Sequence, residues 1–136
     1  MKIFYTKKGI VTAQLDEKDN AIVVNWDNLY DGQIFKECCM AQLEKIEAGV
    51  KALIINIKNS IGFPPQETTE WLKIVYIPEL MKAGLKAIII VEPQNSMTRS
   101  AYQLWLKIFM IGKNTPKFAM EVSDIEEALK KINELS

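Results

Sequence analysis

The sequence predicts one α/β domain over residues 1–136, built on a mixed, mostly parallel β-sheet with an antiparallel N-terminal meander and about four helices. Three observations support this prediction. The first 26 residues hold three short stretches rich in β-branched and aromatic residues, which favour strands. Beyond them, buried-strand patterns alternate with helical patterns, as in parallel strands joined by helical crossovers. The length of 136 residues fits one domain, since domains commonly hold about 100–150 residues.

The opening meander consists of the predicted strands Lys2–Thr6, Ile10–Leu15 and Ala21–Trp26. Turn signals separate them at Lys7–Gly9 and at Asp16–Asn20. Strands joined by such short turns pair antiparallel, because a parallel pair needs a long crossover. We therefore expect this meander to form one edge of the sheet.

Helices and buried strands alternate after the meander. Asp31 and Gly32 open the first helix, whose apolar residues recur at helical spacing until Gly49. The elements that follow are a strand Lys51–Lys58, a helix from about Gln66 to Ala83, a strand Leu85–Val91, a helix from Met97 to about Ile111, a strand Lys117–Val122 and a helix through Leu135. Pro78 should kink or split the second helix, because proline has no amide proton and crowds the preceding turn. Ser123–Glu126 forms a capping box before the last helix.

The composition excludes several classes of function. The chain has 17 Lys+Arg and 17 Asp+Glu, so its net charge is +0 and it lacks the basic footprint of a nucleic-acid-binding protein. It has no histidine, which excludes catalysis by imidazole. The sequence contains neither a glycine-rich phosphate loop nor an Asp-x-Asp cluster. We therefore expect no cofactor, no metal site and no enzymatic activity.

The sequence predicts a cytoplasmic protein without a membrane span. Charged residues occupy Met1–Lys8, where a signal peptide needs its apolar segment. The longest apolar run, Ala87–Val91, is far shorter than the roughly 20 residues that cross a bilayer. The adjacent Cys38 and Cys39 cannot form an ordinary disulfide with each other. We expect them to be small buried residues with free thiols, which require a reducing compartment.

Several patches between Asp19 and the C-terminus carry a family resemblance. They are Trp71, Pro78 and the turn Ala83–Lys86 that follows it, and the closing segments Lys117–Phe118 and Ser123–Leu129. These patches, together with the order of the elements, resemble the small bacterial SpoIIAA-like proteins of the STAS-like group. The resemblance implies a SpoIIAA-like fold and a regulatory module that acts through contacts with a partner protein.

The resemblance also directs attention to phosphorylation. STAS regulators carry a phosphorylated serine in an Asp-Ser-Ser-Gly-like motif before the corresponding helix, and the stretch Asn59–Thr69 lacks that motif. The hydroxyl-bearing residues there are Ser60, Thr68 and Thr69, which are therefore the candidate phosphoacceptors. The carboxylates that flank the two threonines oppose a phosphate at this helix start, although the helix dipole favours it.

Two predicted helices carry more apolar surface than one side of a sheet can cover. In Ala101–Ile111 only Gln103 and Lys107 are polar, and in Trp71–Met81 only Lys73 and Glu79 are charged. An ordinary helix on a sheet exposes a wide polar face to water. The surplus apolar surface must be covered by something besides the sheet, unless the two helices pack entirely in the core.

Three interpretations of this surplus stay open. Besides packing in the core, the helices could form a homodimer or partner interface, with Tyr102, Trp105, Phe109 and Met110 as anchors. They could also enclose an apolar pocket lined by Trp71, Tyr76 and Trp105. We favour the interface and expect a non-catalytic, self-associating binding module. The alternative is a protein that binds a small apolar molecule or a lipid.

Overall fold

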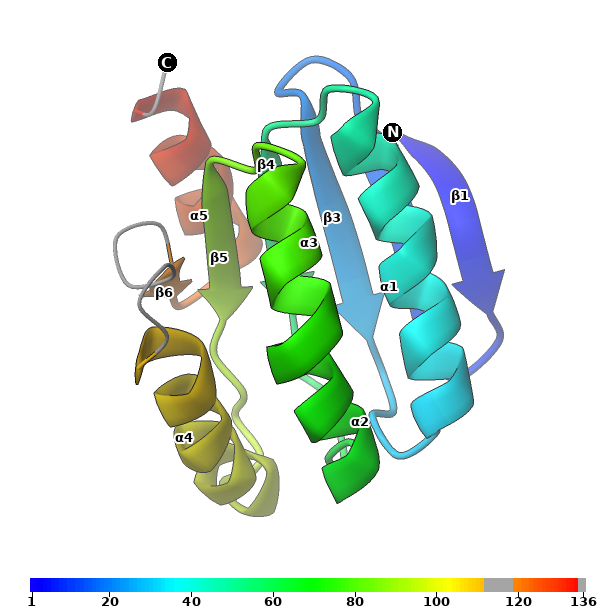
Figure 1. Ribbon diagram of the computed structural model, residues 1–136. Helices are drawn as coiled ribbons and strands as arrows, with labels where there is room; N and C mark the ends of the chain where they lie inside the picture. Colours follow the sequence, from blue (N-terminus) through cyan, green and yellow to red (C-terminus); the bar gives the residue numbers. More distant parts are fainter. Residues whose placement is uncertain (112–118, 135–136) are drawn as a thin grey trace.

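The computed structural model describes residues 1–111 and 119–134, apart from the side chains of residues 104–111. Its centre is a six-stranded sheet in the order β1-β2-β3-β4-β5-β6 (Figure 1). The strands are β1 (Lys2–Lys7), β2 (Val11–Asp16), β3 (Ala21–Trp26), β4 (Ala52–Asn56), β5 (Ala87–Val91) and β6 (Ala119–Val122). The first three strands pair antiparallel, and β3 to β6 pair parallel. The predicted mixed sheet with an N-terminal meander is confirmed.

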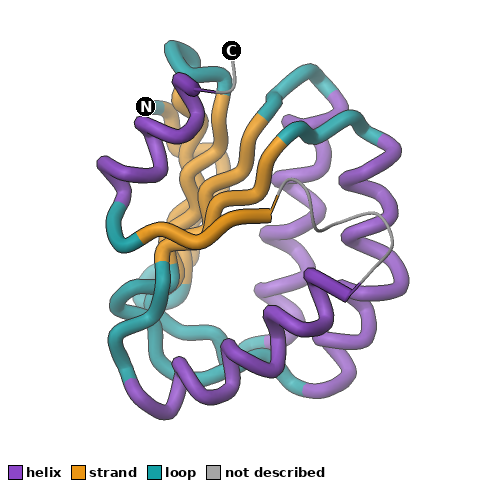
Figure 2. The backbone as a smooth tube through the Cα atoms, turned by 90° about the vertical axis from the view of Figure 1, so that its left-hand side faces the viewer, coloured by secondary structure: helices purple, strands orange, loops and turns teal. Residues whose placement is uncertain are grey.

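The helices lie on both faces of this sheet. They are α1 (Gly32–Glu47), α2 (Gln66–Trp71), a π-helical segment η1 (Leu72–Tyr76), α3 (Ile77–Lys82), α4 (Ser96–Ile111) and α5 (Ile125–Glu134). Helices α1 and α3 cover one face and α5 covers the other (Figure 2). The parallel strands are therefore buried on both sides, which explains their uninterrupted apolar sequences. Among the described residues, no helix combines the length and hydropathy that a membrane crossing requires.

The second predicted helix runs without a break from residue 66 to residue 82, and in place of the predicted kink or split a π-helical turn lies just before Pro78. The amide of Ile77 donates to the carbonyl oxygen of Leu72, five residues back, which defines the π-turn. The wider turn precedes Pro78, whose ring would otherwise crowd the carbonyl of Ile74. With five residues in the turn, Leu72 and Ile77 both point into the core.

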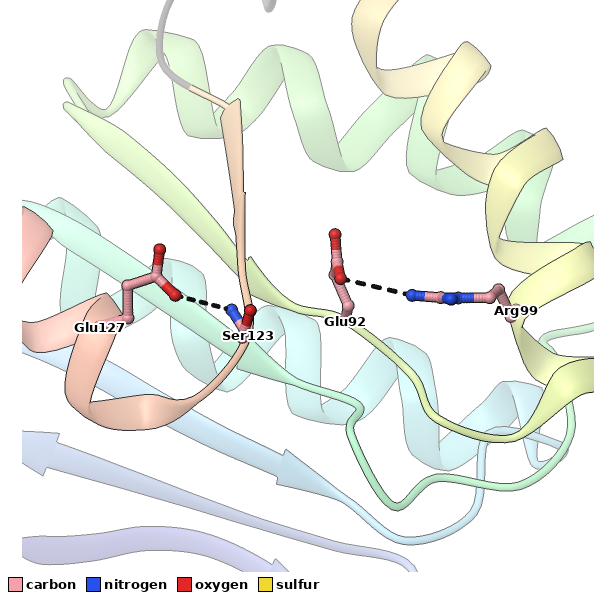
Figure 3. A network of polar contacts seen from close by, with 4 residues as sticks. All are labelled: Glu92, Arg99, Ser123 and Glu127. Atoms are coloured by element: carbon pink, nitrogen blue, oxygen red, sulfur yellow. Dashed lines mark hydrogen bonds and ion pairs between the residues drawn. The ribbon is translucent and has the colours of Figure 1, made fainter.

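The cap of the first helix lies where the sequence predicts it, whereas the cap of the last helix is shifted by one residue. The Asp31 carboxylate accepts a hydrogen bond of 3.0 Å from the Ile34 amide, so α1 begins where predicted. The capping box predicted at Ser123–Glu126 is wrong by one residue, because the residues that cap α5 are Asp124 and Glu127. The Asp124 carboxylate accepts from the Glu127 amide at 2.8 Å. The Glu127 carboxylate accepts from the Ser123 amide at 3.0 Å, the bond drawn in Figure 3.

The shifted cap follows from packing on the sheet. Because α5 starts at Ile125, its residues Ala128 and Ile132, four apart, both face the core. These two residues pack with the buried strand residues of the second apolar cluster, including Ile54 and Ile89. Tertiary contacts therefore set which of two adjacent acceptors caps the helix.

Candidate interaction surface

Three loops meet at the carboxyl edge of the parallel strands and are tied together. The loop after β3 pairs with the loop after β4, since the Leu29 amide donates to the Ile61 carbonyl at 3.0 Å. The Ile61 amide donates back to the Asp27 carbonyl at 3.1 Å. The third connection comes from α4, where the Thr98 hydroxyl donates to the Ser60 carbonyl at 3.4 Å. Backbone hydrogen bonds of this kind hold the loops in one arrangement.

This edge exposes large apolar side chains. Tyr30 is 61% exposed, Ile61 50% and Met97 80%. Each is, or directly follows or precedes in the chain, a residue that makes one of these hydrogen bonds, so their backbones lie at the same edge of the sheet; we call the three residues the carboxyl-edge patch. Gly62, at φ +81, lies against the Tyr30 ring, because a Cβ there would stand 2.5 Å from it. Sequence reasoning missed this patch. The available signal was a large apolar residue among turn-forming or capping residues at three places, namely two loops and one helix start.

The candidate phosphoacceptors lie beneath this edge and are buried. The Ser60 hydroxyl donates to the Trp26 carbonyl oxygen, across from one loop to the strand end of another. The Thr69 hydroxyl donates to the Pro65 carbonyl at 3.4 Å, in the first turn of α2. Thr68 packs against Gly32, where a Cβ would stand 2.5 Å from its hydroxyl oxygen. Of the three hydroxyls, that of Ser60 ties a loop to a strand end, and the phosphorylation of all three residues stays a prediction.

A second exposed apolar area lies on the outer side of η1. The Trp71 ring is half-buried and stacks on Tyr76 with ring centres 5.7 Å apart, and the Lys36 ammonium lies 5.8 Å from the Trp71 ring centre. Trp71 lines an open groove with Met40 of α1 and Val75 of η1. Part of the apolar surplus predicted for this helix is therefore exposed. Tyr76 is buried and belongs to the core.

The predicted apolar pocket corresponds to a small cavity between the sheet and the helices. Its volume is about 30 Å³, far below the roughly 300–1,000 Å³ of typical ligand pockets. Tyr76 and Tyr102 line it, whereas Trp71 does not. Tyr102 is buried, so it lies at the cavity and not on a surface. The side chains of Trp105, Phe109 and Met110 lie outside the described residues, and their assignment stays a prediction.

A buried polar network lies beside the cavity. The Tyr76 hydroxyl donates to the Gln42 carbonyl oxygen at 2.7 Å, and the Gln42 amide donates to Cys38 Sγ at 3.3 Å. Burial raises the pKa of the Cys38 thiol to about 11 and also raises the pKa of the Cys39 thiol well above its ordinary value. Both thiols stay protonated at neutral pH, and this state suits packing and not nucleophilic attack. The prediction of buried free cysteines is confirmed.

Comparison with known proteins identifies the architecture. No family model matches the chain, and a search of curated proteins finds no match. A solved structure of the anti-sigma factor antagonist SpoIIAA in its unphosphorylated form superposes with a TM-score of 0.60 and 19% sequence identity. The superposition covers 89% of this chain and 97% of the SpoIIAA chain. The chain has the SpoIIAA fold. The fold implied by the sequence resemblance is therefore confirmed.

The SpoIIAA fold places the carboxyl-edge patch on the side of the sheet where ligands commonly bind in α/β proteins. Loops at that edge carry function in many folds because the strands hold them rigidly while their sequences vary. A shared fold does not transfer an activity. The chemistry of the patch itself must therefore support any function.

Proposed function

We propose that this chain is a non-catalytic regulatory module that binds a partner protein through the carboxyl-edge patch. The observation that carries the proposal is the exposure of Tyr30, Ile61 and Met97, on two loops and the first turn of α4 that hydrogen bonds tie together. Tyrosine and methionine are enriched at protein interfaces, and clustered exposed apolar side chains mark interaction sites. Because the loops are already ordered, little conformational entropy is lost on binding.

The comparison supports the regulatory part of the proposal. SpoIIAA is an anti-sigma factor antagonist, a protein whose name describes action on another protein. The proposal does not require a phosphorylated residue in this chain. If Ser60, Thr68 or Thr69 is modified, the edge loops must open first, because all three side chains are buried.

Self-association is a second candidate, supported by a different surface. Ile74 and Val75 of η1 are exposed next to the groove that Met40 and Trp71 line. Sedimentation at increasing concentration tests it, with Val75→Asp expected to abolish any dimer. The alternative ligand, a small apolar molecule, has only the cavity of about 30 Å³ in its favour. A larger ligand would have to displace the helices.

The experiment for partner binding uses site-specific photocrosslinking in the native cell. A crosslinking amino acid placed at residue 61 or 97 is expected to capture one protein, which mass spectrometry identifies. The matched control is residue 3, because Ile3 is also an exposed apolar residue, on β1. Capture of the same proteins from residue 3 would contradict the assignment of the surface.

The affinity between this protein and the captured partner is then measured with both proteins purified. Ile61→Asp and Met97→Asp are each expected to weaken binding at least about tenfold, since an unpaired charge must lose water at the interface. Ile3→Asp is expected to bind as the wild type does. Equal affinity for all four proteins would refute a role for the carboxyl-edge patch.

A further inference from the structure

Three lysines from three different connections line one groove at the amino edge of the parallel strands. Lys18 lies in the turn between β2 and β3, Lys51 directly precedes β4, and Lys86 directly precedes β5. These connections lie together at the upper end of the sheet in Figure 1, beside the last turn of α5. The groove has a volume of about 280 Å³, and Ile132 of α5 forms part of its wall. It lies at the opposite end of the strands from the carboxyl-edge patch.

Hydrogen bonds hold the three connections next to one another. The Lys51 amide donates to the Asn20 carbonyl at 3.1 Å, and the Lys86 amide donates to the Lys51 carbonyl at 2.8 Å. The Asn20 side-chain amide donates to the Gly49 carbonyl at 3.0 Å, which attaches the turn before β3 to the loop before β4. The lysine side chains therefore start from backbone positions that the sheet and its turns keep close together.

The ammonium groups of the three lysines are unpaired within the described part of the chain. All three side chains are exposed, and among the described residues none of them makes an ion pair or a side-chain hydrogen bond. Two carboxylates that adjoin the groove in the chain are paired elsewhere, Glu17 with Lys2 at 3.4 Å and Glu134 with Lys131 at 3.7 Å. Asp19 is the one described carboxylate that lines the groove. Among the described lining residues, three positive charges therefore face one negative charge.

We propose that this groove, the amino-edge groove, binds a small anion that carries two or more neighbouring negative groups, such as a diphosphate. A lysine ammonium is a compact charge with three hydrogen-bond donors, and it is a common ligand of phosphate oxygens. Three ammonium groups around one groove can therefore contact different oxygens of one ligand. The ligand would also relieve the mutual repulsion of the three like charges. This inference does not depend on the proposed function.

The size and the surroundings of the groove favour a small ligand that binds weakly. Its volume of about 280 Å³ lies just below the range of typical ligand pockets, which begins at about 300 Å³. The chain as a whole has a net charge of +0, so it lacks the extended basic surface that a nucleic acid requires. Helices α1, α3 and α5 end at this edge, and the negative ends of their dipoles oppose an anion. We therefore expect binding that weakens strongly as salt is added.

Titration of the ¹⁵N-labelled protein with inorganic pyrophosphate at low ionic strength tests the groove. We expect saturable shifts of the amide signals of residues 18–20, 51 and 86, and none at residues 61 and 97. Lys51→Gln and Lys86→Gln are each expected to weaken binding about two- to fivefold, as for loss of one exposed charge pair. Asp19→Asn removes the negative charge from the groove and is expected to tighten binding. The spectrum of each variant also shows whether it is folded.

The matched control is Lys73→Gln. Lys73 is an exposed lysine of η1 outside the groove, and it too has no ion pair among the described residues. The control removes the same charge and should bind pyrophosphate as the wild type does. Equal weakening by Lys51→Gln and Lys73→Gln would overturn the groove, because the net charge alone would then explain the binding. Residues 135–136 lie outside the described residues, and the titration uses the chain with its own end, so any competition from that end is included in the measured affinity.

Two other results would also contradict the proposal. Shifts that grow in proportion to pyrophosphate and never saturate would show diffuse ion association instead of a site. A short single-stranded DNA that displaces pyrophosphate from the same amides at a lower concentration would overturn the choice of a small anion. Saturable binding that the DNA does not displace, and that Asp19→Asn tightens, supports the amino-edge groove as a site for a small anion.

Discussion

At the amino edge of the parallel strands, the turn before β3 bonds to the loop after α1, whereas at the carboxyl edge three loops bond to one another. Both edges are ordered by comparable hydrogen bonds. At the amino edge the Asn20 side-chain amide donates to the Gly49 carbonyl at 3.0 Å, and the Lys86 amide donates to the Lys51 carbonyl at 2.8 Å. The difference lies in the side chains that each edge exposes.

The amino-edge loops expose Lys18, Lys51 and Lys86, which water solvates well. The carboxyl edge exposes Tyr30, Ile61 and Met97, which water solvates poorly. Order alone therefore does not distinguish a functional edge from a structural one. An ordered edge that also exposes apolar side chains is the better candidate for binding a protein, because those side chains stay available for a partner instead of collapsing into the core.

The largest expected effect comes from a pair of glycines, one at each edge. Gly62 and Gly84 have similar backbone angles, φ +81 and φ +86. A Cβ at Gly62 would stand 2.5 Å from the Tyr30 ring, whereas a Cβ at Gly84 meets nothing within 4 Å. Both substitutions to alanine strain the backbone by about 1 kcal/mol. Gly62→Ala must also displace Tyr30.

The difference in free energy of unfolding between Gly62→Ala and Gly84→Ala, measured in urea, isolates the cost of displacing the Tyr30 ring. We expect Gly62→Ala to lower the free energy of unfolding by about 1–2 kcal/mol more than Gly84→Ala does, by analogy with the cost of overpacking. Gly62→Ala should also weaken binding of the partner, because Tyr30 moves. Equal destabilisation by both variants would mean that Tyr30 is free to move and that the edge is less rigid than described.

A smaller effect is expected from Ser60→Ala. The substitution removes the hydroxyl that donates to the Trp26 carbonyl inside the carboxyl edge. Loss of a buried hydrogen bond of this kind costs about 1–2 kcal/mol. The control is Ser100→Ala, since the Ser100 hydroxyl bonds to the Ser96 carbonyl at 3.1 Å on an exposed part of α4. Differential scanning calorimetry should show a lower unfolding midpoint for Ser60→Ala alone. Equal midpoints would show that Ser60 does not tie the loops.

The fold could be predicted from sequence because its determinants are local. Alternation of apolar runs with helical spacing located each strand and helix of the described residues, and Pro78 indicated an irregularity in the second helix, which is a π-helical turn. The cap of the last helix was misplaced by one residue, since Ser123 and Asp124 are both good acceptors. Only the packing of Ala128 and Ile132 on the sheet decides between them.

The candidate site could not be predicted in the same way. Its residues come from loops far apart in the chain, and the hydrogen bonds that join them span 34 residues from Ser60 to Trp26 and 38 from Thr98 to Ser60. The spacing of apolar residues that predicts helices and strands contains no information on such long-range contacts. The sequence also drew attention to hydroxyl groups by type, and the structure buries Ser60, Thr68 and Thr69, of which Ser60 ties the loop after β4 to the end of β3.

The smallest expected effect lies at the amino edge. Asn20 has φ 51, a left-handed conformation that asparagine tolerates and glycine adopts freely. Asn20→Gly relieves this local strain and removes an exposed hydrogen bond to the Gly49 carbonyl, so the two changes nearly cancel. We expect the free energy of unfolding to change by less than about 0.5 kcal/mol and partner binding to stay the same. Loss of binding in this variant, measured beside Ile61→Asp, would place the functional surface at both edges and remove the distinction between them.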